Sequence, residues 1–256
     1  MFIDPVPTQQ QLAAVYDWAT YHGGYVDTSW ERDHKTLTRL ERYGCGAMRL
    51  LDFGCGTGAF LRRAKAAGYQ ATGAEITDKV AREASAKAGV PVVSLEALLA
   101  GPYEFDVVHA RDVLAHLVDP RATLADLVKH LSPQGLLVLD DPIEENPSLV
   151  HAAAKAWSRL SRDTGVRPSG RGPTMLARMT SRSHQRLVDG LGLTVLACWV
   201  TETGWPYYVA GKPITTRAAR LKACIGWSAK ALWWLDPTDT LGNRIFLVCR
   251  RTGARG

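Results

Sequence analysis

A glycine-rich turn carries the strongest chemical signal in this chain. The sequence LDFGCGTG (51–58) places Gly54, Gly56 and Gly58 after an apolar stretch and before a predicted helix. Glycines let the backbone bend sharply and let a ligand approach it closely. The spacing G-x-G-x-G differs from the dinucleotide fingerprint G-x-G-x-x-G, which disfavours a dehydrogenase. Asp52, which precedes the turn, would repel a pyrophosphate but would suit an ammonium group.

A second acidic residue lies at the end of the next apolar stretch. Glu75 follows Asp52 by 23 residues, where a second strand is predicted to end. A carboxylate in this position can accept hydrogen bonds from both ribose hydroxyls of an adenosine ligand. Each feature alone is common in proteins. The two together, in this order and spacing, are a strong signal for such a ligand.

These residues require a sheet whose strands end at one edge. Short buried strands are predicted at 48–53, 69–76, 90–95, 103–110 and 136–141. Helices are predicted between them at 59–68, 77–89 and 121–131, and a turn at 132–135. This alternation predicts an α/β fold with a parallel sheet and helices on both faces. Ligands of such sheets bind beyond the carboxyl ends of the strands.

The remaining segments are expected to complete a single domain around this core. We expect an N-terminal helical cap at 1–45, the core at 46–142, and a closing helix and strands at 181–201 and 244–251. Two insertions, 143–180 and 202–243, are expected to form a substrate cap. The second insertion contains a predicted amphipathic helix at 214–234. The residues expected near one face of that helix are Ala218, Leu221, Ile225, Ser228 and Leu232.

Composition excludes several classes of protein. The 256 residues are 46% hydrophobic and 22% charged, which is typical of a globular domain and not of a disordered chain. The five cysteines are widely spaced and form no CxxC pair, which argues against a zinc site and a disulfide framework. No apolar run approaches the roughly 18–20 residues of a membrane span. We therefore expect a cytoplasmic location and no membrane partner.

The charge is distributed unevenly along the chain. Residues 1–140 carry a net charge of −3 and residues 141–256 a net charge of +9. The segment from Lys155 to Arg186 contains eight basic residues and one acidic residue, Asp163. This stretch is either a solvated surface or a positive mouth that attracts an anionic substrate. Nucleic acid is the weaker option, because the basic residues are spread out and no RRM or KH motif occurs.

The core resembles the class I S-adenosylmethionine (SAM)-dependent methyltransferases, in the small-molecule branch related to ubiquinone-biosynthesis methyltransferases. The segments that carry the resemblance are LLDFGCGTGAFL (50–61), GAEIT (73–77), SLEAL (94–98), FDVVHARDVLAHLVDP (105–120) and LVKHLSPQGLLVLDDP (127–142). The resemblance implies a seven-stranded, Rossmann-like, mostly parallel sheet. It also implies SAM as the cofactor and S-adenosylhomocysteine (SAH) as its product.

The resemblance implies a cofactor site at the glycine turn. The three glycines would pass under the amino-acid end of SAM, Asp52 would face its ammonium group, and Glu75 would hold the ribose. The residues implied around the adenine and the methionine portion are Ile76, Ser94, Leu95, Glu96, Ala110 and Arg111. By its position in the N-terminal segment, Tyr25 could close over the cofactor.

Methyl transfer from a sulfonium depends mainly on the alignment of acceptor, methyl group and sulfur. A general base is needed only where the acceptor holds its proton, as an alcohol does. The catalytic candidates are His116, Asp141 and His151, ahead of His184 and Glu144. Asp141 is also expected to border the acceptor, with Trp205, Tyr207 and Tyr208 as an aromatic wall. Relatives often carry an acidic residue directly before the histidine that corresponds to His116, and in some of them acids near this place bind a divalent metal. This chain has Ala115 there, so no metal is expected.

The favoured function is SAM-dependent methylation of a small-molecule acceptor, with oxygen as the preferred atom. A natural-product intermediate, a sugar or a nucleoside would each suit the two insertions. One alternative is an RNA methyltransferase that uses the basic C-terminal half. Another is a non-catalytic SAM-binding subunit of a partner protein. The oligomeric state stays open.

Overall fold

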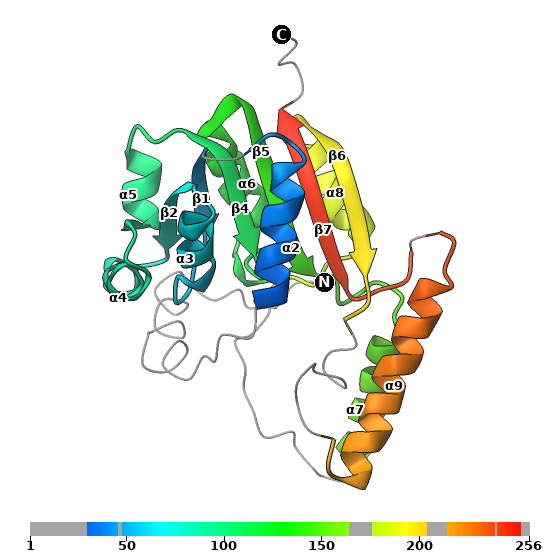
Figure 1. Ribbon diagram of the computed structural model, residues 1–256. Coiled ribbons are helices and arrows are strands. Elements are labelled where there is room, and N and C mark those ends of the chain that lie inside the picture. Colours follow the sequence, from blue (N-terminus) through cyan, green and yellow to red (C-terminus); the bar gives the residue numbers. More distant parts are fainter. Residues whose placement is uncertain (1–29, 46–47, 164–175, 204–213, 239, 252–256) are drawn as a thin grey trace.

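The fold is given by a computed structural model, which describes residues 30–45, 48–163, 176–203, 214–238 and 240–251 (Figure 1). A seven-stranded sheet forms its centre, in the order β3-β2-β1-β4-β5-β7-β6. The strands are β1 (Arg49–Phe53), β2 (Gln70–Glu75), β3 (Val92–Ser94), β4 (Phe105–Arg111), β5 (Leu131–Pro142), β6 (Leu193–Thr201) and β7 (Arg244–Arg251). The first five strands run parallel, and β7 lies antiparallel between β5 and β6. The predicted seven-stranded α/β fold is therefore confirmed.

Helices cover both faces of the sheet and also extend beyond its carboxyl edge. They are α2 (Trp30–Glu41), α3 (Ala59–Ala66), α4 (Asp78–Ala88), α5 (Leu95–Ala100), α6 (Pro120–Lys129), α7 (Leu149–Asp163), α8 (Ser181–Asp189) and α9 (Arg217–Trp234), with the short 3-10 helix η2 (Leu114–His116). The apolar residues of α2, α3 and α4 form one core with the sheet, and those of α5, α6 and α8 form another on the opposite face. Figure 1 shows α2 and α3 in front of the strands and α6 and α8 behind them. Strands buried on both faces explain the short continuous apolar runs of the sequence.

Local signals set most helix boundaries. Thr77 caps α4 by accepting a hydrogen bond from the backbone of Val80, and Gly89 ends the helix in the left-handed conformation. Pro120 occupies the first turn of α6, where its missing N–H has no helical partner to lose. A helix between the third and fourth strands was expected, but no bounds were predicted for it; the structure shows α5 there. Its six residues begin directly after β3, where the Ser94 hydroxyl accepts a hydrogen bond from the backbone of Ala97.

The turn predicted at 132–135 is wrong, because these residues belong to β5. Phe105 pairs with Leu131 and Val107 pairs with Leu136, so β5 advances five residues while β4 advances two. The extra residues form an irregularity inside the strand and not a connection before it. Leu131 and Leu136 are both buried on either side of it, which holds the two parts of the strand in one sheet.

The apolar face predicted for α9 is also wrong. Leu221 and Leu232 are 66% and 48% exposed, and Ser228 is exposed as well. Instead the helix packs against α7 and buries Ala223, Gly226 and Ala229. Small side chains on this side let the two helix backbones approach each other, so the large apolar residues face outward. Ile225 is half-buried, and the side chain of Ala218 lies outside the described residues.

Both insertions leave the sheet at its carboxyl edge. One follows the end of β5, and the other connects the end of β6 to the start of β7 at the same edge. Figure 1 shows α7 and α9 side by side beyond this edge. A buried amide joins their bases: the Asn146 side chain donates to the carbonyls of Thr240 and Gly242 and accepts from the backbone of Ser181. The two insertions are thus held together where they leave the core.

None of the helices in the described part of the chain combines the length and apolar content needed to cross a bilayer.

Candidate functional site

The glycine turn lies at the carboxyl edge of the sheet, between β1 and α3. Gly54, Gly56 and Gly58 have φ angles of 72°, 54° and 72°, all in the left-handed region. A Cβ on Gly54 would lie 2.5 Å from Cγ2 of Val113, and one on Gly58 would lie 2.4 Å from Cβ of Ala88. Both the backbone angles and the lack of space therefore require glycine at these two positions.

Glu75 is held against this turn. Its Oε1 accepts a hydrogen bond of 2.5 Å from the backbone N–H of Gly56, and its Oε2 accepts one of 3.2 Å from Ile76. The side chain is buried, and burial raises the pKa of Glu75 to about 7, although the two backbone donors oppose the shift. The negative charge of Asp52 raises the pKa of Glu75 further. The glycine turn, Asp52 and Glu75 therefore lie together in one site, as the sequence predicted.

A histidine that the sequence analysis did not single out lies beside Asp52. Asp52 on β1 and His109 on β4 are direct neighbours in the sheet, and Nδ1 of His109 lies 2.7 Å from Oδ1 of Asp52. Both residues are buried. The His109 ring packs on Phe60 of α3, with ring centroids 4.3 Å apart. Strand register decides this contact, so a spacing in the sequence could not have revealed it.

The residues predicted around the adenine occupy different environments. Ser94 is the neighbour of Glu75 across β2 and β3, and its hydroxyl caps α5. Ile76 is half-buried and belongs to neither apolar core of the described residues. Leu95 packs against the core, and Glu96 is exposed. Ser94 and Ile76 are thus the two that lie next to Glu75.

Arg111 makes structural ion pairs at the end of β4. Its guanidinium donates to Asp33 of α2, to the hydroxyl of Thr36 at 3.1 Å and to Asp140 at 3.1 Å. Asp33 is completely buried and also binds Arg63. These contacts fasten α2 over the carboxyl edge of the sheet. The side chain of Ala110 is buried in the core, so only its backbone could face a ligand.

Arg244 forms a second ion pair with Asp140, beside the one that Arg111 forms. Arg244 donates from Nε to Asp140 at 2.5 Å and from Nη1 to Asp112 at 2.9 Å. Burial opposes the ionisation of Asp140, but Arg244 and Arg111 outweigh it and hold the pKa of this carboxyl well below its usual range. Neither Arg244 nor Asp33 was predicted, because their partners lie far away in the sequence.

Two of the three catalytic candidates, His116 and Asp141, lie at the loop that follows β4, and the third, His151, lies on α7. Asp141 is buried, and its Oδ1 accepts a hydrogen bond of 3.1 Å from the backbone of Val113. Oδ2 of Asp141 lies 3.7 Å from Nε2 of His184, a buried residue of α8. His116 ends η2 and is half-buried. His151 lies in the first turn of α7, with Nδ1 3.5 Å from the carbonyl of Asn146. Asp141 therefore contacts the loop that carries His116.

The structure does not describe the four aromatic residues that were predicted to line the site. Tyr25, Trp205, Tyr207 and Tyr208 lie outside the described residues.

The basic stretch from Lys155 to Arg186 is partly paired with acidic residues. Lys155 pairs with Glu145 at 3.0 Å, and Arg178 pairs with Glu144 at 3.5 Å and with Glu145 at 3.6 Å. Acids that precede the stretch in the sequence thus neutralise part of its charge.

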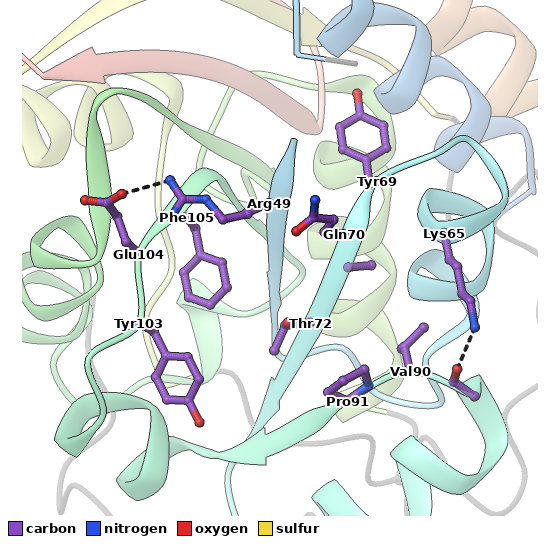
Figure 2. Close-up of a pocket in the computed structure, with 12 residues that line it drawn as sticks. Arg49, Lys65, Tyr69, Gln70, Thr72, Val90, Pro91, Tyr103, Glu104 and Phe105 are labelled. Atoms are coloured by element: carbon purple, nitrogen blue, oxygen red, sulfur yellow. Dashed lines mark hydrogen bonds and ion pairs between the residues drawn. The ribbon is translucent and has the colours of Figure 1, made fainter. Parts of the chain in front are cut away.

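A pocket of about 470 Å³ lies at the other edge of the sheet (Figure 2). It is lined by residues at the amino ends of three strands, among them Arg49 of β1, Gln70 of β2 and Phe105 of β4. Dashed lines mark the contacts of Arg49 with Glu104 and of Lys65 with the Gly89 carbonyl. Ligands of parallel sheets bind at the carboxyl edge. This pocket is therefore separate from the glycine turn.

Residues 28–197, more than half of the chain, match a family described as a methyltransferase domain. The chain belongs to the class I SAM-dependent methyltransferases. Its sheet order, its glycine turn and the buried acids beside that turn agree with this membership. Two buried carboxylates beside left-handed glycines also fit the cofactor, because SAM carries ribose hydroxyls, an ammonium group and a positive sulfur.

Named relatives of this methyltransferase are similar over part of their length. The ubiquinone biosynthesis O-methyltransferase of Caulobacter sp. (strain K31) is 30% identical over 158 residues, which are 54% of this chain and 62% of that protein. The one from Cereibacter sphaeroides (strain ATCC 17029 / ATH 2.4.9) is 32% identical over 169 residues, which are 57% of this chain and 66% of that protein. The chain thus spans less than two thirds of these relatives.

Solved structures with low sequence identity share the fold of this methyltransferase. The (4+2)-cyclase SpnF superimposes with a TM-score of 0.60 at 21% identity, over 98% of both chains. The magnesium protoporphyrin IX methyltransferase ChlM from Synechocystis PCC 6803, with bound SAH, gives a TM-score of 0.53 at 14% identity, over 95% of this chain and 92% of that one.

Proposed function

We propose that this methyltransferase transfers the methyl group of SAM to an oxygen atom of a small-molecule acceptor. The observation that carries the proposal is the meeting of two buried carboxylates, Asp52 and Glu75, at the glycine turn. Buried charges need partners. A ligand that brings hydroxyl donors and positive charge would supply them. The choice of oxygen is supported by the relatives, which are named as O-methyltransferases.

In this proposal the residues of the turn hold the cofactor along its length. Glu75 accepts hydrogen bonds from the ribose hydroxyls, and Asp52 faces the ammonium group. The backbone of residues 54–58 passes beneath the amino-acid end, where the start of α3 offers N–H groups without a side-chain cap. Ile76 covers one face of the adenine, because it is half-exposed beside Glu75 and absent from the apolar cores of the described residues.

The chain's own residues are proposed to orient the acceptor and to take its proton. When bound, SAM supplies an electrophilic methyl group, and its loss leaves SAH. We assign the proton to His116, because this histidine is half-buried, and so not sealed in the core, in the loop at the carboxyl edge. Asp141 is buried and hydrogen-bonded to Val113, so we assign it to holding this loop in place. His151 is the alternative base, because it begins the helix of the first insertion.

The test of the proposal is calorimetric titration of the purified protein with SAM and SAH, beside a Glu75→Ala variant. We expect micromolar binding by the natural protein and a loss of at least about tenfold in the variant, since one hydrogen bond to a charged group accounts for that much. A radiolabelled-methyl assay against alcohols, phenols and sugars then identifies the acceptor class. Absence of binding to both ligands would refute the proposal.

A further inference from the structure

We propose that His109 is a positioning residue that directs Asp52 toward the ammonium group of SAM. The inference rests on the proposed function, because it concerns the amino-acid end of the same cofactor site. It goes beyond that function by assigning a task to a residue of β4 that contacts Asp52 and not the ligand.

The sheet places the two side chains together. Asp52 and His109 are neighbours in the parallel pairing of β1 and β4, so their side chains leave the sheet on the same face. The separation of 2.7 Å between Nδ1 of His109 and Oδ1 of Asp52 is in the range of a charge-assisted hydrogen bond. A carboxylate has no proton to give, so Nδ1 of His109 is the donor.

The rest of the imidazole has apolar surroundings. His109 is completely buried, and its ring lies against Phe60. Nε2 of His109 has no hydrogen-bond partner among the described residues. A buried polar atom without a partner costs free energy, so an apolar side chain would pack here more favourably. The contact with Asp52 is the one polar interaction that explains a histidine at this position in the described structure.

Asp52 needs a fixed orientation because it shares its site with Glu75. The charge of Asp52 raises the pKa of Glu75, so the two carboxylates repel each other. A hydrogen bond from His109 holds Oδ1 of Asp52 on the β4 side and leaves Oδ2 for a ligand. An imidazole does this with a single N–H donor. A lysine or arginine in its place would form an ion pair with Asp52 and compete with the ammonium group.

The experiment compares two ligands and three substitutions by calorimetry. The ligands are SAH and an SAH analogue that lacks the α-amino group. We expect His109→Leu to weaken SAH binding by about tenfold or more and to leave the analogue within about twofold. His109→Asn keeps an N–H donor and should restore most of the affinity for SAH. His109→Phe, which keeps a ring of similar size, serves the same comparison if the leucine variant does not fold.

Two controls separate this role from a general structural one. His130→Leu removes a histidine at the opposite edge of the sheet, where Nδ1 contacts the Tyr103 carbonyl, and should leave SAH binding unchanged. In an Asp52→Asn background, His109→Leu should weaken SAH binding no further. Equal losses for both ligands, or no loss for SAH, would overturn the inference while the proposed function stands. If the natural protein binds neither ligand, the proposed function fails as well.

Discussion

Glu75 is expected to make the ligand-free methyltransferase less stable as the pH rises from 5 to 8. The pKa of a glutamate in an unfolded chain is about 4.3, and burial raises the pKa of Glu75 in the folded protein to about 7. The folded state therefore binds this proton more tightly than the unfolded state does. The resulting stabilisation is complete below the unfolded pKa and is lost as the pH rises through the folded pKa.

The size of the effect follows from the two pKa values. Each pKa unit corresponds to about 1.36 kcal/mol, so a difference of about 2.7 units corresponds to about 4 kcal/mol in the free energy of unfolding, of which about 3 kcal/mol is lost between pH 5 and pH 8.5. Glu75→Gln removes the titrating group. For a domain of this size, 1 kcal/mol shifts the melting temperature by about 2–4 °C. We therefore expect the variant to gain about 6–12 °C over the natural protein between pH 5 and pH 8.5.

The measurement is urea unfolding and thermal melting of both proteins across this pH range, without ligand. The pH dependence of the difference is the informative quantity, because the glutamine amide also changes the hydrogen bonds to Gly56 and Ile76 by an amount that does not titrate. Glu41→Gln, at an exposed position of α2, is the matched control and should run parallel to the natural protein.

Saturating SAM should raise the melting temperature of the natural protein at pH 8.5 far more than that of the Glu75→Gln variant. A difference between Glu75→Gln and the natural protein that stays constant with pH, or that shrinks as the pH rises, would contradict the reasoning. It would mean that Glu75 is ionised in the folded protein at no cost.

Three further predictions concern the turn, the ion pairs and the base. Gly58→Ala should lower the free energy of unfolding by about 3 kcal/mol, because the new methyl group would clash with Ala88. Gly44 has the same φ of 72° but open space around it, so Gly44→Ala should cost about 1 kcal/mol. Equal losses in urea unfolding would exclude the clash with Ala88. Asp33→Ala should cost about 3 kcal/mol or more because it removes the buried carboxylate that Arg63 and Arg111 share, whereas Glu104→Ala at an exposed pair should cost under about 1 kcal/mol. Similar values for the two variants would argue against a buried ion pair. His116→Gln should lower turnover about 100-fold or more with SAH affinity unchanged, and unchanged turnover would remove His116 as the base.

The sequence by itself determined the features that depend on neighbouring residues. The glycine turn, the acid at the end of β2, the cap and stop of α4, and the proline in the first turn of α6 are local, because backbone angles and capping bonds involve residues a few positions apart. The last strand was predicted with the bounds that the structure shows, 244–251, because an apolar run between polar segments marks it. Family resemblance added the order in which such local elements assemble.

Only the tertiary structure decided which distant residues meet. The contact of Asp52 with His109 joins residues 57 positions apart, Asp33 with Arg111 joins 78, and Arg244 with Asp140 joins 104. Each of these contacts depends on strand register or on which face of a helix packs against the sheet. The spacing of residues along the sequence does not determine either. The same reason explains the wrong face of α9. Its helical periodicity was real, but its alanines and glycine fit against α7, and this packing decided which side was buried.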